Sequence, residues 1–429
     1  MCDFFNENLR TESNSNIAIK ECTLLRFRYR RAARANMLYE LLLVDETTGH
    51  AKKQWVSGSI FKGGKAKKLS EKFSSAASAN GENNADIQLP GFSYIQDLQM
   101  FVQCFPMDRH LPEIAKVMEH GDPAVNALLM QQFGQGDWHV EQREIVPVRY
   151  RPGMGATVRA TVRARNEAND TQATRSTYLK VYRTNDPAAA FNSLTLLSDA
   201  AERSNAAFAV AAPIGYSEET GALAIVPAAG KPLEDLLLLD GDLRQIARRS
   251  AEALFAFHMS DVPMIRRRSK EVSLARAKKA ADFLKWACPD LSQRIDHIYS
   301  ELDKRLSDDI CHPAHLDLKA DHIFLNDDIV TFIDMDSAAG GDPVLDPAML
   351  LARLRAMPDL LPISQDRVQR FGDLLTEHYF SLAPSGWRRR LGPAYACASL
   401  KVALYYLQHL EQNWREKIAQ TLSSAEEHL

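Results

Sequence analysis

The sequence lacks the features of several common protein classes. No stretch approaches the roughly 18 apolar residues of a membrane-spanning helix, and the N-terminal MCDFFNENLRTESN has no apolar run of a signal peptide. Its six cysteines are scattered without a CxxC pair, which is typical of reduced thiols in the cytoplasm. A net charge of -3 gives no reason to expect nucleic acid or an anionic membrane as a partner. We therefore expect a cytoplasmic protein with neither partner.

Two kinds of hydrolytic site are also missing. The sequence contains no GxSxG motif for a serine nucleophile and no HExxH motif for zinc. The spacing of His312 and His315 could hold a metal on a helix, but Pro313 lies between them and a strand pattern follows. Serine-hydrolase and zinc chemistry are therefore disfavoured. The segment FPMDRHLP, which begins at Phe105, indicates packing and turn residues rather than chemistry.

The order of the patterns favours an α+β protein. The chain has 429 residues, 45% apolar and 25% charged, which is enough for two or three globular domains. Alternating strand patterns come first, and residues 233–307 and 345–429 then have helical periodicity, with a short hairpin at 310–334 between them. The small, polar residues 66–88 predict a flexible connector. We expect three domains, at residues 1–140, 141–230 and 231–429. The second is predicted to be a small antiparallel sheet lobe and the third a large helical lobe.

An internal repeat links the first two of these domains. FRYRRAARANMLYELLLVDETTG begins at Phe27, and VRYRPGMGATVRATVRARNEAND begins at Val148. Both open with Arg-Tyr-Arg and continue through a turn into an alternating strand. Tyr29 and Ser59 are as far apart in the sequence as Tyr150 and Lys180, so the two segments align without a gap. The N-terminal region is therefore predicted to contain a degenerate copy of the sheet lobe, with Ser59 in place of Lys180.

The stretch with the most candidate catalytic and metal-binding side chains is CHPAHLDLKADHIFLNDDIVTFIDMD, which begins at Cys311. Phosphoryl transfer needs a carboxylate at the acceptor hydroxyl, and Mg²⁺ with one or two protein carboxylates. Asp317 and Asp334 can supply these two groups. The segment between them predicts two short strands around an Asn-Asp-Asp turn, and a hairpin brings its two ends together. The two carboxylates are therefore expected to flank one site.

Two motifs carry a family resemblance. HLDLKADHI, from His315, resembles the catalytic loop of the protein-kinase-like fold. FIDMDSAAGGDPVLD, from Phe332, resembles the metal-binding segment of the aminoglycoside phosphotransferase family. The similarity covers about residues 145–420 and is closest in style to the sugar-kinase-like, maltokinase-type members. It implies a bilobal protein-kinase-like fold with an extra N-terminal α+β region.

The resemblance assigns roles in the catalytic loop and at the metal. Asp317 matches the catalytic residue that orients the acceptor hydroxyl, and His315 matches the histidine that braces the loop. Asp334 matches the Mg²⁺ ligand. His322 stands where the family has Asn, or Gln in some sugar-kinase-like members, and it either contacts a metal or supports the loop. Acidic positions that brace the loops from below correspond to Asp342 and Asp346.

The resemblance also assigns a nucleotide site. Lys180 matches the strand lysine that holds the phosphates, and Gly153 and Gly155 fall in the turn that covers them. The segment from Ile225, with Val226 and Ala228, matches the hinge whose backbone reads the adenine. Lys319 stands where protein kinases place a lysine on the transferred phosphate. The helix expected after Lys180 should carry a pairing Glu, but its only Glu is Glu202.

The implied activity is transfer of phosphate from ATP, with Mg²⁺, to a hydroxyl of a small molecule. The expected acceptor is a sugar, an amino sugar or a polyol. The sequence departs from the family pattern at three places, which leaves an alternative open. His322 offers a softer ligand than an amide oxygen, Leu316 replaces the usual Gly or Arg, and the expected phosphate-covering turn RPGMGATV has few glycines. The alternative is a non-catalytic relative that acts as a nucleotide sensor or a protein scaffold. The sequence does not indicate an oligomeric state.

Overall fold

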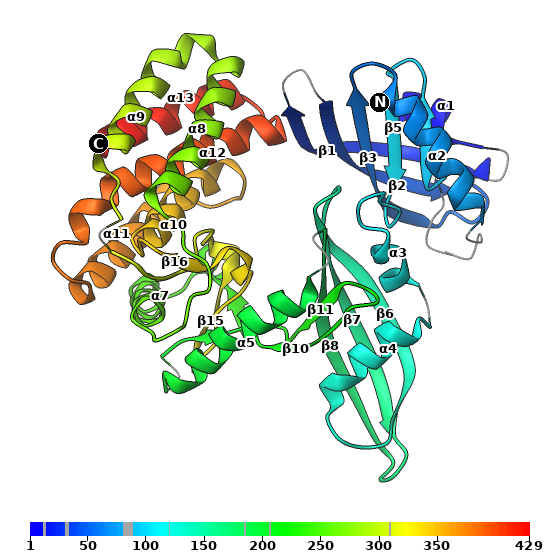
Figure 1. The fold of residues 1–429 in the computed structure, drawn as a ribbon, viewed down its shortest axis with the longest axis horizontal. Coiled ribbons are helices and arrows are strands. Elements are labelled where there is room, and N and C mark those ends of the chain that lie inside the picture. The colour runs from blue at the N-terminus through cyan, green and yellow to red at the C-terminus, as the bar shows by residue number, and fades with distance from the viewer. Residues whose placement is uncertain are drawn as a thin grey trace. The chain divides into compact units, whose positions relative to one another are not determined.

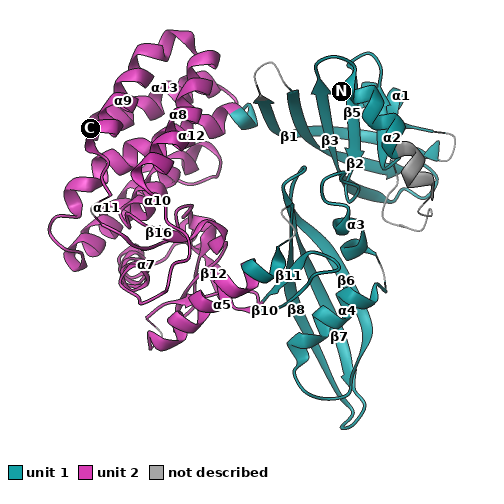
Figure 2. Cartoon of the chain, viewed as in Figure 1, with its two compact units in different colours: residues 1–189, 214–225, 408–410 teal, residues 190–213, 226–407, 411–429 magenta. Residues whose placement is uncertain are grey.

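The structure is a computed structural model that forms two compact units (Figures 1 and 2). Unit 1 contains residues 1–189, 214–225 and 408–410, and unit 2 contains residues 190–213, 226–407 and 411–429. The described residues are 1–11, 14–30, 34–79, 89–119, 121–183, 186–205, 207–308 and 310–429.

The first sheet of unit 1 has five strands in the order β1-β2-β3-β5-β4. Alternate residues are buried along the second half of β2, whereas β3 is buried on both faces over residues 56–59. The core on this sheet holds large side chains such as Phe5, Leu41 and Val56, all inaccessible to solvent. Its strands are β1 (Ile17–Arg30), β2 (Arg34–Asp45), β3 (Ala51–Phe61), β4 (Phe92–Ile95) and β5 (Met100–Cys104), and α1 (Cys2–Leu9) packs on it.

The second sheet of unit 1 has an equivalent order, β6-β7-β8-β11-β10. In both sheets a three-stranded meander is followed by a helix and then by a hairpin whose second strand joins the meander. The registers also correspond, because Asn36 pairs with Ser59 in the first sheet and Thr157 with Lys180 in the second. Its strands are β6 (Trp138–Arg151), β7 (Gly155–Asn166), β8 (Thr171–Tyr182), β10 (Pro213–Ser217) and β11 (Ala222–Ile225).

The connector predicted at 66–88 is wrong over its first part. Residues Lys65–Ala79 form the helix α2, which packs on the first sheet (Figure 1). Ala66, Leu69 and Phe73 have helical spacing and pack with Phe61 and Phe101 in a small aromatic core. Small and charged neighbours hid this stripe in the sequence. Residues 80–88 of the predicted connector lie outside the described residues.

The two sheets of unit 1 share a hydrophobic core. Phe105, after β5, packs against Tyr150 of β6 with ring centroids 4.9 Å apart, and Trp55 stacks on the same ring. The buried residues of β7 alternate along this core, from Ala156 through Val158 to Val162. Two helices that follow β5 also contribute to it, α3 (Glu113–Met118) and α4 (Pro123–Met130).

Unit 2 is mostly helical, as residues 233–307 and 345–429 predict. Its short strands lie in and around the stretch that carries Asp317 and Asp334. Strands β14 and β15 form the predicted hairpin, β12 and β9 pair with its outer edges, and β13 pairs with β16. These strands are β9 (Ala209–Val210), β12 (Lys231–Pro232), β13 (His312–Ala314), β14 (Ile323–Leu325), β15 (Val330–Phe332) and β16 (Ala339–Gly341). The helices are α5 (Pro187–Arg203), α6 (Leu233–Leu238), α7 (Leu243–His258), α8 (Lys270–Ala287), α9 (Ser292–Arg305), α10 (Leu345–Ala356), α11 (Gln365–Leu382), α12 (Leu391–His409) and α13 (Trp414–Glu427).

The predicted α+β class is confirmed by these sheets and helices. The boundary predicted at residue 140 falls within β6, and the one at 230 directly precedes β12. Within the described part of the chain, no helix is long and apolar enough to cross a membrane.

Candidate active site

A buried carboxylate holds the loop that carries Asp317. Asp346, at the start of α10, is inaccessible to solvent and accepts hydrogen bonds from the backbone N–H groups of His315 and Leu316, both at 2.6 Å. It also contacts His258 Nε2 at 3.0 Å. Leu316 has a left-handed backbone, with φ of 63°. Because that conformation is costly for a residue with a Cβ, the two hydrogen bonds to Asp346 explain how the loop keeps its shape.

His315 braces the loop from its buried side. Its ring is inaccessible to solvent, and Nε2 lies 2.9 Å from the carbonyl oxygen of Ile333, so this nitrogen donates. The ring also stacks against His322, with centroids 5.4 Å apart. His315 thus connects the loop that carries Asp317 to the residue that precedes Asp334.

Asp317 projects from this loop between two lysines. Lys401 of α12 forms a direct ion pair with Oδ1, and Lys319 Nζ lies 3.6 Å from Oδ2. Burial would raise the pKa of Asp317, but the positive charges of Lys401 and Lys319 outweigh that effect and lower it. Asp317 is therefore ionised at neutral pH, and it is suited to orienting a hydroxyl rather than to acting as a strong base.

The hairpin places Asp334 beside the same group. The Asn326 side chain closes the predicted turn by accepting from the N–H groups of Asp328 and Ile329. Asp334 follows β15 in a left-handed conformation, with φ of 58°, and its Oδ2 lies 3.5 Å from His322 Nε2. His322 Nε2 is in turn 3.3 Å from Lys319 Nζ. Contacts therefore run from Asp317 through Lys319 and His322 to Asp334.

His322 is a neutral imidazole in this environment. Burial, Lys319 and His315 lower its pKa to about 2, although the nearby carboxylates act in the opposite direction. A neutral imidazole nitrogen can bind a metal, but Mg²⁺ prefers hard oxygen ligands. The donor set fits a Mg²⁺ held by Asp334 that takes its other ligands from phosphate and water. His322 Nε2 lies 3.5 Å from one oxygen of the Asp334 carboxylate.

A second acidic residue braces the segment that follows. Asp342 Oδ2 accepts from Arg390 Nε and Nη2, at 3.0 and 2.7 Å, and its Oδ1 accepts from the N–H of Val344. Together with Asp346, it fixes the start of α10 below the loop.

In unit 1, the structure places Lys180 and the two glycines on adjacent strands. Lys180 is half-buried on β8, opposite Thr157 of β7 and Leu223 of β11. Gly153 lies in the turn between β6 and β7, with a positive φ of 66°. Gly155 begins β7, where a Cβ would lie 3.1 Å from the carbonyl oxygen of Val181. A side chain would strain the first position and crowd the second.

The turn at Gly153 is held by a residue that the sequence did not single out. Asp108, only 2% exposed, accepts from the Gly153 N–H at 2.6 Å and from the Tyr150 hydroxyl at 2.8 Å. It also accepts from the N–H of His110 at 2.8 Å. The segment predicted to hold packing and turn residues therefore fixes the turn that is expected to cover the phosphates. Asp108 is far from Gly153 in the sequence, so no local pattern could have revealed the contact.

Val226 and Ala228, which the resemblance assigns to an adenine-binding hinge, lie directly after β11, in unit 2. The Val226 N–H donates to the carbonyl oxygen of Ala212 at 2.9 Å, and its side chain is 43% exposed. Ala228 is half-buried. Glu202, the only Glu in the helix after Lys180, is exposed near the end of α5.

Sequence reasoning also missed the side chains that approach Asp317 from distant helices. Lys401 contacts it from α12, and His258 of α7 supports Asp346. Neither residue is part of a recognisable motif, since each reaches the loop only through tertiary packing.

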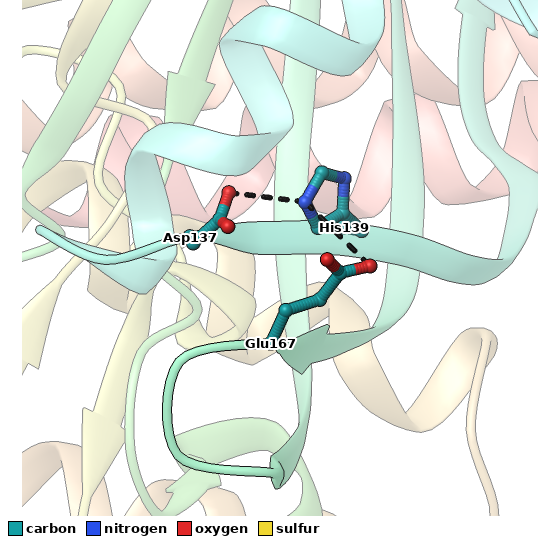
Figure 3. Close-up of side chains that lie close together, drawn as sticks. All are labelled: Asp137, His139 and Glu167. Carbon is teal, nitrogen blue, oxygen red and sulfur yellow. Dashed lines mark hydrogen bonds and ion pairs between the residues drawn. The ribbon is translucent and has the colours of Figure 1, made fainter.

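An exposed group in unit 1 has the composition of a metal site (Figure 3). His139 Nε2 lies 3.0 Å from Asp137 Oδ1 and 3.9 Å from Glu167 Oε1. All three side chains are more than half exposed. Such surface pairs are common without a metal and contribute little to stability, so we assign this group no role.

The chain has relatives of known family. The model of the phosphotransferase enzyme family matches residues 160–418, which is more than half of the 429 residues. No curated protein matches the chain. This match confirms the predicted family and the fold class that the resemblance implied.

Several solved structures are similar to this one. For aminoglycoside phosphotransferase APH(2'')-Ib with ADP bound, the identity is 14%, the match covers 72% of this chain and 99% of that one, and the TM-score is 0.44. For ethanolamine kinase from Plasmodium vivax the identity is 13%, the coverage 75% and 95%, and the TM-score 0.45. For choline kinase from Cryptosporidium parvum Iowa II the identity is 10%, the coverage 70% and 93%, and the TM-score 0.45. With the family model matched over most of its length, the chain belongs to the phosphotransferase enzyme family.

Proposed function

We propose that this protein transfers the γ-phosphate of ATP to a hydroxyl group of a small molecule. The acceptor oxygen forms a new bond to phosphorus as the bond between the β,γ-bridging oxygen and the γ-phosphorus breaks. ADP leaves with that electron pair, and the hydroxyl proton passes to Asp317 or to solvent. A sugar, an amino sugar or a polyol is the expected acceptor class.

The observation that carries this proposal is the continuous set of contacts between the two carboxylates. Asp317 and Asp334 stand on the two sides of the β14–β15 hairpin and are connected through Lys319 and His322. Asp317 is held ionised and fixed by a buried loop, so it can position the hydroxyl. Lys319 lies between the carboxylates, where it can contact the transferred phosphate.

Asp334 would hold Mg²⁺, which neutralises the negative charge on the β- and γ-phosphates when it is bound. Its carboxylate is 18% exposed, so a ligand can reach it, and His322 beside it is nearly inaccessible. A protonated His322 would repel the metal. The lowered pKa of His322 keeps this position neutral at physiological pH.

In the nucleotide site we assign Lys180 to the phosphates and the turn of Gly153 and Gly155 to their cover. The left-handed Gly153, held by Asp108, presents a fixed backbone turn. Val226 and Ala228 would supply the backbone groups that read the adenine. His315 has a positioning role, because its ring is inaccessible to solvent.

The second candidate is a non-catalytic relative that binds nucleotide as a sensor or serves as a protein scaffold. The replacement of the family Asn by His322 and the few glycines in RPGMGATV favour it. The two candidates differ in one measurable reaction, acceptor-dependent release of ADP, which only the first permits.

The first test is thermal unfolding with ATP alone, Mg²⁺ alone, and both. A ligand of the folded state raises the midpoint according to its saturation. ATP with Mg²⁺ should stabilise the wild type but not Asp334→Ala. The matched control is Asp327→Ala, because Asp327 is exposed at the tip of the same hairpin, and it should behave as the wild type.

The second test is ADP release with a panel of hydroxylated acceptors. Asp317→Asn should keep the stabilisation by ATP and Mg²⁺ but lose turnover by about 10²–10⁴-fold, the range for a removed general base or orienting group. Normal turnover in Asp317→Asn or Asp334→Ala would refute the assignment. Stabilisation by nucleotide without any acceptor-dependent ADP would favour the non-catalytic candidate.

A further inference from the structure

Four cationic side chains gather around Asp317. Lys401 and Lys319 contact its two carboxylate oxygens. The Arg268 guanidinium donates to the carbonyl oxygen of Leu316, the residue before Asp317, at 3.0 Å. Arg353 of α10 lies over the ring of Tyr405, 5.1 Å from its centroid.

Arg353 and Lys401 reach the same place from two helices. Tyr405 follows Lys401 by four residues on α12, so both side chains lie on one face of that helix. Arg353, resting on Tyr405, therefore lies beside Lys401. Electrostatic coupling is consistent with this placement, because burial together with the charges of Arg353 and Arg268 lowers the pKa of Lys401, against the opposing effect of Asp317.

The proposed reaction accounts for only part of this positive charge. Lys401 balances Asp317, and Lys319 is placed for the transferred phosphate. Arg268 and Arg353 remain. In the described part of the chain, the Nε atoms of both arginines are buried and have no hydrogen-bond partner. A buried donor without a partner costs about 1–3 kcal/mol, which an anion accepting from these groups would recover.

We infer that the acceptor is an anionic hydroxyl compound, a hydroxy acid, sugar acid or phosphorylated polyol, whose negative group binds Arg353 and Arg268 while its hydroxyl meets Asp317. This inference rests on the proposed phosphotransferase function and replaces its expected acceptor, a sugar, an amino sugar or a polyol, by an anionic hydroxyl compound. It excludes amino sugars, because an ammonium group beside these cations would be repelled. It also disfavours a neutral sugar as the preferred acceptor, because a hydroxyl oxygen accepts a weaker hydrogen bond from a guanidinium than an anion does and leaves its charge unbalanced.

A structural network is the rival explanation of the same charges. An ion pair between Lys401 and Asp317 can be a stabilising contact, and Arg353 gains some energy from Tyr405. That explanation accounts for Lys401 but leaves the two buried Nε–H groups without a role.

The test compares acceptors that share a carbon skeleton and differ in one substituent, which is anionic, neutral or cationic. One set is glucuronate, glucose and glucosamine, and the second is glycerate, glycerol and 3-amino-1,2-propanediol. ADP release gives kcat and KM for each compound with the wild type, Arg353→Gln, Arg353→Lys and Arg355→Gln. Arg355 is exposed on the same helix, so Arg355→Gln is a matched control for loss of one arginine.

We expect the anionic member of at least one set to have a kcat/KM at least tenfold above its neutral and cationic counterparts. Arg353→Gln should raise the KM for the anion by about 10-fold to 100-fold, the effect of a lost charge-assisted hydrogen bond, and leave the KM for ATP unchanged. Arg353→Lys should keep part of the preference, and Arg355→Gln should keep all of it.

Three results would overturn the inference. One is equal or better use of a neutral or aminated acceptor, and another is an unchanged charge preference in Arg353→Gln. The third is a wild type that ATP and Mg²⁺ stabilise but that phosphorylates no anionic compound of either set, which would leave the nucleotide site standing. Failure of ATP and Mg²⁺ to stabilise the wild type is a separate outcome that would refute the proposed function itself.

Discussion

The buried carboxylate of Asp346 gives the sharpest test of how the active-site loop is held. Replacing it with Asn keeps the size of the side chain and removes the charge and one acceptor oxygen. In the wild type, Oδ2 receives His258 and the His315 N–H, while Oδ1 receives the Leu316 N–H. An amide can accept at only one of these two positions. Its NH₂ group would then face another donor.

The structure sets the size of the expected loss. A buried N–H left without an acceptor costs about 1–3 kcal/mol, and the other two hydrogen bonds weaken because they lose their charge assistance. Because Asn is neutral, the variant no longer pays the free-energy cost of burying a charge, which offsets part of the lost stability. We expect Asp346→Asn to lower the free energy of unfolding by about 3 kcal/mol, which corresponds to roughly 6–12 °C in the midpoint of a domain of this size.

Thermal and urea unfolding of the wild type and Asp346→Asn measure this loss without any substrate. Asp373→Asn is the control, because Asp373 is exposed on α11, and it should change stability by less than about 0.5 kcal/mol. A double-mutant cycle with His258→Gln should give a coupling of about 0.5–3 kcal/mol. A variant as stable as the wild type would refute the view that Asp346 holds Leu316 in its left-handed conformation. Additive effects would show that His258 acts elsewhere.

Two more predictions concern residues near the proposed ligands. His322 is buried and its pKa is lowered from 6.5 to about 2, so below pH 6.5 the unfolded chain gains a proton that the folded chain does not, and stability falls by up to about 1.4 kcal/mol per pH unit. Between pH 7.5 and 5.0, the free energy of unfolding measured with urea should fall by about 2 kcal/mol less in His322→Gln than in the wild type. The contribution of Asp317 is lost only below about pH 4, so it does not interfere. Equal falls in the two proteins would contradict the neutral state of His322. Asp108→Asn leaves the Gly153 N–H or the Tyr150 hydroxyl poorly matched, so it should lower the free energy of unfolding by about 2 kcal/mol and weaken stabilisation by ATP, whereas an unaltered response to ATP would separate Asp108 from the nucleotide turn.

Local patterns in the sequence predicted the hairpin and its flanking acids well. The alternation of β7 predicted a half-buried strand, and the Asn-Asp-Asp turn predicted the closure between β14 and β15. The acids at Asp317 and Asp334 lie a few residues from this hairpin, so their proximity follows from local geometry. The brace at Asp346 was expected only through the family resemblance, because its partners lie about 30 residues away.

What the sequence could not predict depends on tertiary packing. The helix α2 looked like a connector because its apolar stripe is short and lies among lysines and serines. Lys401 and Arg353 belong to helices whose surfaces show no motif, and only the packing of α10 and α12 brings them to Asp317. A single sequence does not reveal which of many surface charges meet in three dimensions.

The two sheets of unit 1 share a strand order but differ at the position of the proposed phosphate-binding lysine. At the register position where β8 carries Lys180, β3 carries Ser59, which is 8% exposed and donates to the Asn36 side chain at 3.0 Å. That hydroxyl is neutral and already bonded to the neighbouring strand, so it offers no charge for phosphates. What the first sheet does supply is packing: Phe105 against Tyr150, and Asp108, just after β5, bonded to the turn of Gly153. The same backbone plan therefore serves in the first sheet as a rigid support for the turn that, in the second sheet, is assigned to nucleotide.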